Sequence, residues 1–290
     1  MRILLATLVA SLGAAAPTAK IQAGIQPFGS VEVNGSLWVT LIADAKVAKI
    51  NPATNKVVAR VKTGFAPFAV AYGAGSLWTA NSSSGTVTRI DPKKNKVLKT
   101  IKVGGRPYDI AFGAGAVWVG NNGGTVNRIN PRTNKLVKTI RAGNEPNGIV
   151  FAFGAIWTGD RLGNQLLKID PATNRISASL KLDSPDWVTP DETGLWVSEE
   201  QAGSVVHVDP ATLQVTATVK VGANPLHSAV VGGDLWVPNL DDSTISVVDR
   251  ATGTLKDTFA GPAGAIAITR AAKDVWVSGS TGTEVWRFSP

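Results

Sequence analysis

Short runs of alternating apolar and polar residues recur along this chain, and glycine, proline, asparagine or aspartate ends most of them. One set of four such runs covers residues 68–72, 77–80, 86–90 and 96–102. Alternation with a period of two, over lengths of four to seven residues, is typical of β-strands with one buried face. The pattern therefore predicts a chain built only from strands, in units of four.

A tryptophan in the second strand marks every unit. It recurs at intervals of 39 or 40 residues, as Trp38, Trp78, Trp118, Trp157, Trp196, Trp236 and Trp276. Repeats of about 40 residues with only strand signals indicate the blades of a β-propeller. We predict an all-β chain that forms a seven-bladed β-propeller with four-stranded antiparallel blades.

The turn after the third strand has its own recurring sequence, for example Asp91-Pro-Lys-Lys-Asn95 and Asn51-Pro-Ala-Thr-Asn55. Aspartate or asparagine can cap such a turn with its side chain, proline fixes φ at the next position, and the last asparagine tolerates a left-handed backbone. This segment predicts the hairpin between the third and fourth strands.

The two ends of the chain predict how the ring closes. The seventh unit stops at Pro290, after its third strand, whereas Lys20-Ile-Gln-Ala-Gly24 precedes the first unit and resembles the end of a fourth strand. We expect residues 18–24 to supply the missing strand, which would leave no open sheet edge at the junction. Residues 17–290 then form one domain.

Residues 1–16 have the pattern of a cleaved signal peptide: an arginine at position 2, an apolar run and Ala14-Ala15-Ala16. We expect an exported protein, periplasmic or extracellular. No later stretch has the roughly 20 apolar residues that a membrane helix needs, so we expect no membrane insertion. The chain has no cysteine, which excludes disulfides, thiolate metal sites and cysteine nucleophiles.

Charge is divided unequally between the halves of the chain. Residues 1–145 carry a net charge of +14 and residues 146–290 one of −6. Most of the basic excess lies in residues 56–62, 96–102 and 135–141, which are predicted outer strands. Two interpretations remain open: the basic residues bind nucleic acid or another polyanion, or they keep exposed strand edges from pairing with other molecules.

Loops that enter and leave the inner strands of a propeller open on one face, so we compared the residues found there in each unit. The two residues after the proline that precedes each first strand read Phe28-Gly29, Phe68-Ala69, Tyr108-Asp109, Asn147-Gly148, Asp186-Trp187, Leu226-His227 and Ala263-Gly264. Asp109, Trp187 and His227 break a position that is otherwise glycine or alanine. We predict a ligand-binding funnel formed by Phe28, Phe68, Tyr108, Asp109, Asn147, Asp186, Trp187 and His227.

Carboxylates gather in the fourth and fifth units, where they indicate either a solvated acidic rim or a site for a hard cation. They are Asp160, Asp183, Asp186, Asp191, Glu192, Glu199 and Glu200. The second histidine, His207, occupies a position that is lysine or arginine in the first four units, so we expect an exposed structural role. No Gly-x-Ser-x-Gly sequence supports a serine nucleophile.

The turn sequence and the Leu-Trp-Val/Thr strand resemble those of YVTN-type surface propellers and of streptogramin lyases of the virginiamycin B lyase type, over essentially the whole mature chain. The second resemblance implies a Mg²⁺-dependent lyase with a histidine as general acid or base and a glutamate that holds the metal. His227 and Glu199 would be catalytic, and Asp160 and Glu199 would be metal ligands. His227 is displaced by one residue from the position that the lyases use.

Three functions follow as hypotheses. The first is a non-catalytic exported propeller, without cofactor, that binds a small molecule or a protein in its funnel. The second is the Mg²⁺-dependent lyase. The third is nucleic-acid or polyanion binding by the basic half, although that half lacks interleaved aromatic residues for base stacking.

Overall fold

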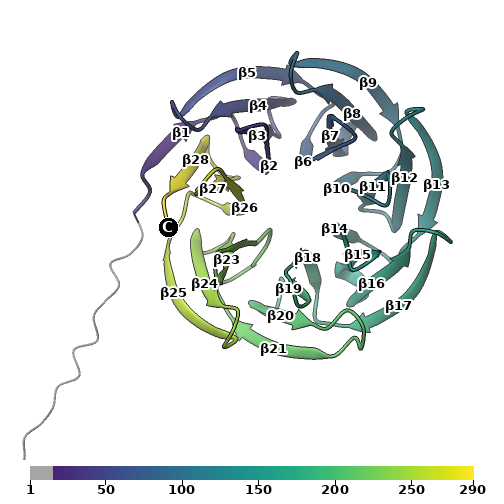
Figure 1. Ribbon diagram of the computed structural model, residues 1–290, viewed down its shortest axis with the longest axis vertical. Coiled ribbons are helices and arrows are strands. Elements are labelled where there is room, and N and C mark those ends of the chain that lie inside the picture. Colours follow the sequence, from purple (N-terminus) through teal and green to yellow (C-terminus); the bar gives the residue numbers. More distant parts are fainter. Residues whose placement is uncertain (1–15) are drawn as a thin grey trace, which may run out of the picture.

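Residues 16–290, which the computed structural model describes, form seven four-stranded antiparallel sheets around a central axis (Figure 1). Blades 1 to 3 hold β2 (Pro27–Val33), β3 (Ser36–Leu41), β4 (Lys46–Asn51), β5 (Lys56–Lys62), β6 (Pro67–Gly73), β7 (Ser76–Asn81), β8 (Thr86–Asp91), β9 (Lys96–Lys102), β10 (Pro107–Gly113), β11 (Ala116–Asn121), β12 (Thr125–Asn130) and β13 (Lys135–Arg141). Within blades 1 to 6 the strands follow chain order from the axis to the rim, and in blade 7 the rim strand is the N-terminal one.

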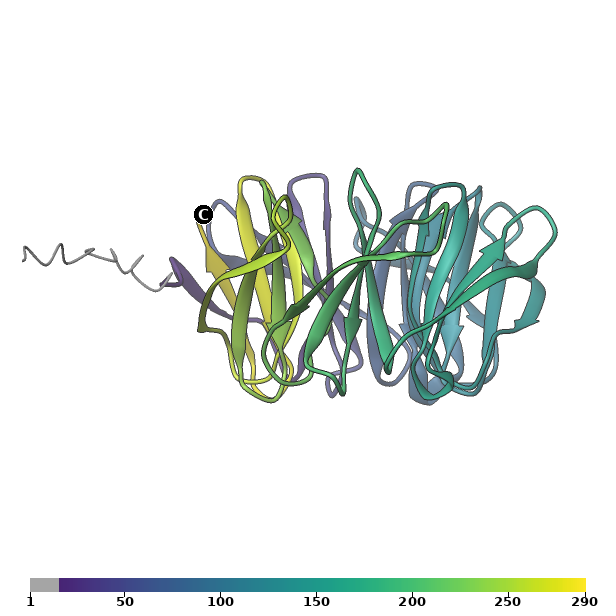
Figure 2. The same cartoon turned by 90° about the horizontal axis from the view of Figure 1, so that it is seen from below.

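The remaining blades repeat this order. Blades 4 to 7 hold β14 (Pro146–Ala152), β15 (Ala155–Asp160), β16 (Gln165–Asp170), β17 (Arg175–Lys181), β18 (Pro185–Pro190), β19 (Leu195–Glu199), β20 (Ser204–Val208), β21 (Val215–Lys220), β22 (Ala229–Val231), β23 (Asp234–Asn239), β24 (Thr244–Asp249), β25 (Thr254–Ala260), β26 (Ala265–Ala271), β27 (Asp274–Gly279) and β28 (Glu284–Phe288). Two short 3-10 turns, Ser82–Ser84 and Arg161–Gly163, follow β7 and β15. The side view shows the loops gathered on two opposite faces (Figure 2).

The N-terminal strand closes the ring, as the sequence predicted. Strand β1 (Ala19–Gln22) pairs antiparallel with β28, with Ala19 opposite Arg287 and Ile21 opposite Val285. Ile21 is buried against the seventh blade. The predicted signal peptide lies, apart from Ala16, outside the described residues. No helix within residues 16–290 is long and apolar enough to cross a membrane.

The repeat tryptophans are buried between blades, where a basic residue of the third strand covers most of them. The guanidinium of Arg128 lies 4.9 Å from the ring centre of Trp118 and donates a 2.8 Å hydrogen bond to the carbonyl of Pro171 in the next blade. Arg287 repeats this arrangement across the closure, with a 2.7 Å bond to the carbonyl of Pro52. The cation thus joins the core of one blade to the turn of its neighbour.

His207 occupies this position in blade 5. Its ring centre lies 4.9 Å from that of Trp196, and its Nδ1 lies 2.6 Å from Oγ1 of Thr216. The turn sequence also acts as predicted: Oδ1 of Asp91 accepts a hydrogen bond from the amide of Lys93, and Asn95 has a φ of 54°. The contacts of His207 and the turn geometry of Asp91 and Asn95 therefore give these three residues structural roles.

Candidate ligand-binding site on the propeller axis

The register between the first and second strands aligns the seven blades at the axis. Pro27 lies opposite Leu41, and the equivalent pair in blade 7 is Ala265 and Gly279. The residue after each of these first positions forms what we call the upper ring: Phe28, Phe68, Tyr108, Asn147, Asp186, Leu226 and Ile266.

Blade 7 corrects one detail of the sequence comparison, which placed Ala263 and Gly264 at the axis because they follow Pro262. The strand in fact begins three residues later, and Ile266 and Ala267 occupy the two axial positions. The position eleven residues before a repeat tryptophan is equivalent to Pro27 in every blade, and for Trp276 it is Ala265. This spacing would have identified Ile266 and Ala267 as the axial residues of blade 7.

Apolar members of the upper ring close the axis on one side. The ring centres of Phe28 and Phe68 are 5.0 Å apart, and those of Phe68 and Tyr108 are 4.8 Å apart. Leu226 of blade 6 and Ile266 of blade 7 pack against Phe28 of blade 1. These contacts bury aromatic and aliphatic surface where a propeller of this size would otherwise be open along its centre.

The polar members of the ring, Asn147 and Asp186, face a cavity of about 300 Å³ that we call the upper pocket. Its lining residues are Phe28, Tyr108, Asn122, Glu145, Asn147, Arg161, Asp186, Glu200, Asn224, Leu226, Leu240, Ile266 and Ser280. A neighbouring depression of about 600 Å³ shares Phe28 with it and is lined by Phe68.

Four buried side-chain oxygens in the upper pocket have no hydrogen-bond partner among the described residues. They are Oδ1 of Asn122, Asn147, Asp186 and Asn224. Because a buried acceptor without a partner is costly, such a concentration indicates a place where another molecule donates the missing hydrogen bonds.

An ionic network forms one wall of the upper pocket. Arg161 donates to Oε2 of Glu145 through Nε, at 2.9 Å, and to Oε2 of Glu200 through a terminal nitrogen, also at 2.9 Å. Although burial opposes it, these carboxylates hold the pKa of Arg161 above its ordinary value. The upper pocket therefore has three carboxylates, from Glu145, Glu200 and Asp186, and one guanidinium, from Arg161.

Burial and the nearby Glu200 raise the pKa of Asp186 to about 7. Burial also raises the pKa of Tyr108 well above its usual value, and the charge of Asp186 adds to this effect. Near neutral pH, Asp186 can therefore exchange a proton when a ligand arrives.

The sequence comparison missed several lining residues because it considered the two residues after each proline, whereas Glu145, Arg161 and Asn224 lie just before a proline or just after a second strand. The residue before each proline and the residue after each second strand are joined by a backbone hydrogen bond, as from Arg161 to Glu145 at 3.1 Å and from Leu240 to Asn224 at 3.0 Å. Loops linked in this way bring both positions over the axis.

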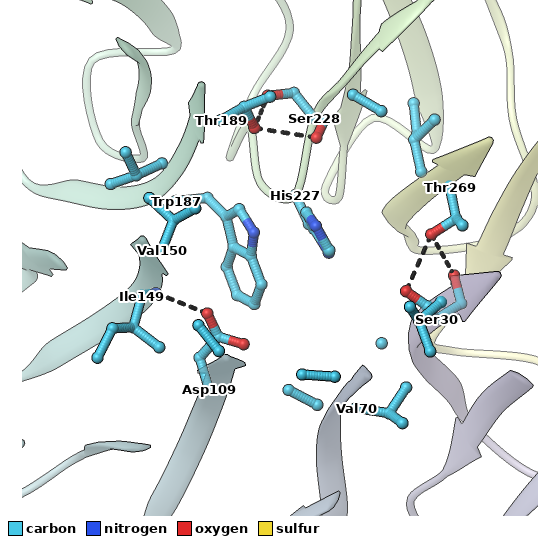
Figure 3. A pocket seen from close by; sticks show the side chains of 18 of the residues that line it. Ser30, Val70, Asp109, Ile149, Val150, Trp187, Thr189, His227, Ser228 and Thr269 are labelled. Atoms are coloured by element: carbon cyan, nitrogen blue, oxygen red, sulfur yellow. Dashed lines mark hydrogen bonds between the residues drawn. The ribbon is translucent and has the colours of Figure 1, made fainter. Parts of the chain in front are cut away.

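The residues that break the small-residue position lie on the other side of the upper ring. Asp109, Trp187 and His227 (Figure 3) line a channel of about 420 Å³ whose lining also includes Tyr72 and Arg270. At the equivalent position of Gly148, an added Cβ would lie 2.7 Å from the Cα of Trp187. The backbone of the next blade therefore explains the small residues.

Contacts with neighbouring blades hold Asp109, Trp187 and His227 in place. Oδ2 of Asp109 accepts a 2.6 Å hydrogen bond from the amide of Ile149 in the next blade (Figure 3). His227 lies before the short strand β22 and forms a parallel bridge with Ala267 of blade 7. Its imidazole stacks on Trp187 with ring centres 4.5 Å apart.

Burial controls the charge of both ionisable groups in the channel. It raises the pKa of Asp109 to about 7 and lowers that of His227 to about 4. His227 is neutral at physiological pH, and its Nδ1 is buried without a partner among the described residues. Hydroxyl pairs, Ser30 with Thr269 and Thr189 with Ser228, complete the polar lining (Figure 3).

The predicted funnel is thus two separate cavities. Phe28, Tyr108, Asn147 and Asp186 line the upper pocket, and Phe68 lines the adjoining depression, whereas Asp109, Trp187 and His227 line the channel. The upper ring separates the upper pocket from the channel. Alternation along a strand accounts for this, since successive side chains point in opposite directions.

The carboxylates implied as metal ligands do not fit a metal site. Oδ1 of Asp160 accepts hydrogen bonds from the amides of Asn144 and Glu145, and Glu199 accepts from the amide of Asp183 and the hydroxyl of Ser204. No three His, Asp or Glu side chains within residues 16–290 are grouped to hold a metal ion.

The pair implied as catalytic is not brought into one cavity either. His227 lines the channel, and Glu199 lines neither the channel nor the upper pocket. Both oxygens of Glu199 instead accept hydrogen bonds that hold the loops around β19. The structure therefore gives no shared site in which these two side chains could act on one substrate.

Comparisons with known proteins agree with this architecture. The family model of YNCE-like beta-propellers matches residues 1–142. A comparison with curated proteins finds no match.

Three solved structures share the fold at low sequence identity. A streptogramin B lyase has a TM-score of 0.80 at 14% identity, covering 91% of this chain and 93% of its own. The WD40 propeller domain of Doa1 has a TM-score of 0.78 at 15% identity, covering 96% and 97%. A chain of Kuenenia stuttgartiensis hydrazine synthase has a TM-score of 0.72 at 14% identity, covering 98% and 99%. These proteins differ in function, so the likeness extends to the fold alone.

Proposed function

We propose that this protein is an exported propeller that binds a small organic amine in the upper pocket. The observation that carries the proposal is the convergence of four unpartnered buried oxygens, from Asn122, Asn147, Asp186 and Asn224, on one cavity. An ammonium group has several donors and no acceptor, so it matches a site made of acceptors.

The charge around the pocket supports a cationic ligand. Glu145 and Glu200 share Arg161, and Asp186 adds a further carboxylate that forms no ion pair with another of the described residues. A ligand ammonium would compensate Asp186 and favour its ionised form.

The remaining wall supports an apolar body on the same ligand. Phe28, Leu226 and Ile266 present apolar surface beside the polar oxygens, and the ring of Tyr108 also lines the pocket. Small-molecule sites commonly combine apolar walls with a few oriented polar groups in this way.

Calorimetry with three probes of the same shape tests the proposal: phenethylamine, 2-phenylethanol and phenylacetate. We expect the amine to bind best and the anion not to bind, and we expect Asp186→Asn to weaken amine binding by at least about tenfold, as loss of a charged partner implies. Asp109→Asn serves as the matched control, because its carboxylate lies on the channel side of the ring. Equal binding of the amine and phenylacetate, or an unchanged affinity in Asp186→Asn, would contradict the proposal.

A further inference from the structure

The outer strands of blades 1 to 3 carry a surface that the axial site does not explain. Each of β5, β9 and β13 has three Lys or Arg residues and no acidic residue. In the fourth blade, β17 has two basic residues, and β21 in the fifth has one. Within residues 16–290, none of the basic residues of β5, β9 and β13 takes part in an ion pair.

A β-bulge places one residue of each outer strand outside the pairing register. In blade 2, Arg89 lies opposite Lys99 and Ile90 opposite Val97, so Leu98 is the extra residue. The same register shift leaves Val58 and Val137 unpaired in blades 1 and 3. A bulge bends the strand and redirects this side chain.

The bulge residue differs in kind between the two halves of the ring. It is aliphatic in blades 1 to 3 and polar in blades 4 to 6, where it is Ser177, Thr216 and Lys256. Val58, Leu98 and Val137 are exposed by 55%, 52% and 52%. The three blades that carry the basic strands are therefore also those that expose an aliphatic side chain at the bulge.

Protection of strand edges does not account for this combination. Bulges and lysines both discourage edge pairing, but an exposed valine or leucine at the bulge works against that purpose. Aliphatic side chains set among unpaired lysines match an anionic lipid surface, where the charges meet phosphates and the aliphatic groups enter the boundary of the acyl chains.

We propose that the rim formed by β5, β9 and β13 attaches this protein to the surface of a membrane rich in anionic phospholipids. The three strands are consecutive along the rim (Figure 1) and form one continuous basic arc. A nucleic acid would use the same charges but would gain little from the aliphatic residues, and stacking aromatic residues are absent from these strands.

Sedimentation with vesicles tests the charge contribution. We expect the protein to bind vesicles of phosphatidylcholine and phosphatidylglycerol in a ratio of about 3:1, and not vesicles of phosphatidylcholine alone, with weaker binding at high salt. Lys96→Glu with Lys102→Glu in β9 should reduce the partition coefficient by at least about tenfold. Arg175→Glu with Lys181→Glu makes the same charge change at the same strand positions of β17 and should have little effect.

A second variant separates a lipid surface from a nucleic acid. Val58→Ser, Leu98→Ser and Val137→Ser together keep every charge and copy the polar bulge of blade 4. This variant should lose most vesicle binding while any binding to a single-stranded oligonucleotide is unchanged. Vesicle binding that survives the serine variant, equal losses in the β9 and β17 variants, or binding to the oligonucleotide but not to vesicles would each overturn the proposal. Circular dichroism and thermal unfolding establish that the variants are folded.

Discussion

The imidazole of His227 and the indole of Trp187 lie stacked in the channel, with ring centres 4.5 Å apart. Strand β18 supplies the tryptophan, and the parallel bridge to Ala267 fixes the backbone of the histidine. Burial favours the neutral imidazole over the imidazolium, because loss of water penalises the charged form. At neutral pH the stack is therefore a packing contact between two uncharged rings, and the cost of protonating His227 comes from burying its charge.

The first prediction concerns the protonation of His227. Its pKa in the folded protein is lowered to about 4 by burial, so the folded state binds fewer protons than the unfolded state between about pH 6.5 and 4. Stability contributed by the neutral ring is present above this range and is lost as the pH falls through it. An NMR titration of the two histidine rings, assigned with His207→Gln, should show His227 titrating near pH 4, and a midpoint above 6 would contradict this environment.

The second prediction concerns Asp109 and stability. Burial raises its pKa to about 7, so the folded state holds a proton that the unfolded state has lost, and stability falls as the pH rises from about 4 to 7. Asp109→Asn keeps the acceptor for the amide of Ile149 and removes the ionisation. Urea unfolding should find the variant more stable than the parent at pH 8, on the order of a few kcal/mol, with a smaller difference at pH 5.

An exposed carboxylate supplies the control for this experiment. Asp241 is solvent-exposed on a loop of blade 6, and Asp241→Asn should change stability by less than about 0.5 kcal/mol at either pH. The prediction would be contradicted if the stability difference between the parent and Asp109→Asn were the same at pH 5 and pH 8. Asp109 would then ionise in the folded protein as easily as in the unfolded chain.

The third prediction gives the pH dependence of amine binding. Because the pKa of Asp186 is raised to about 7 in the free protein, a ligand cation binds best to the ionised form. The affinity for phenethylamine, which stays protonated over this range, should rise by about tenfold between pH 6 and 8. Calorimetry in buffers of different ionisation enthalpy should also detect proton release. In Asp186→Asn the affinity should be low and independent of pH.

The fourth prediction concerns ring closure. Ile21 and Ile101 occupy equivalent positions in the outer strands of blades 7 and 2, and both are buried. Truncation of either to alanine should lower the free energy of unfolding by about 2–4 kcal/mol.

The two variants should differ in local opening. Strand β9 is connected to its blade by a turn, whereas no turn connects β1 to β28, which hold together by pairing and side-chain contacts such as Gln22 with Glu284. Hydrogen exchange of β1 amides should therefore accelerate in Ile21→Ala and not in Ile101→Ala. Equal protection of the β1 amides in both variants would contradict this prediction. It would mean that β1 opens no more easily than an outer strand that a turn connects to its blade.

The number of blades, the turns and the closing strand were predictable because local signals repeat seven times. Trp118 and its equivalents set the period, and Asp91 with Asn95 set the turn. Each copy supports the others, so one irregular unit does not obscure the pattern. The misplacement of Ala263 arose where the repeated proline shifts by three residues.

The division of the axis into two cavities was less predictable. The sequence comparison recognised Asp109, Trp187 and His227 as exceptions, but it placed them in the same funnel as the upper ring because each directly follows a ring residue in the sequence. Their separation depends on which way each side chain points when seven strands converge. Asn122 and Asn224 lie in loops, and only the folding of those loops over the ring brings their oxygens together.

Pairing of β1 with β28 also sets the order of events during synthesis. Among the described strands β1 is made first and β28 last, so the seventh sheet stays incomplete until β28 has been made. Until then Ile21 can pack only against the part of its cluster that blade 1 supplies, and it lacks Ala271, Trp276 and Val285 of blade 7. Pairing of β1 with β28 therefore converts an open arc of blades into a ring as a late step.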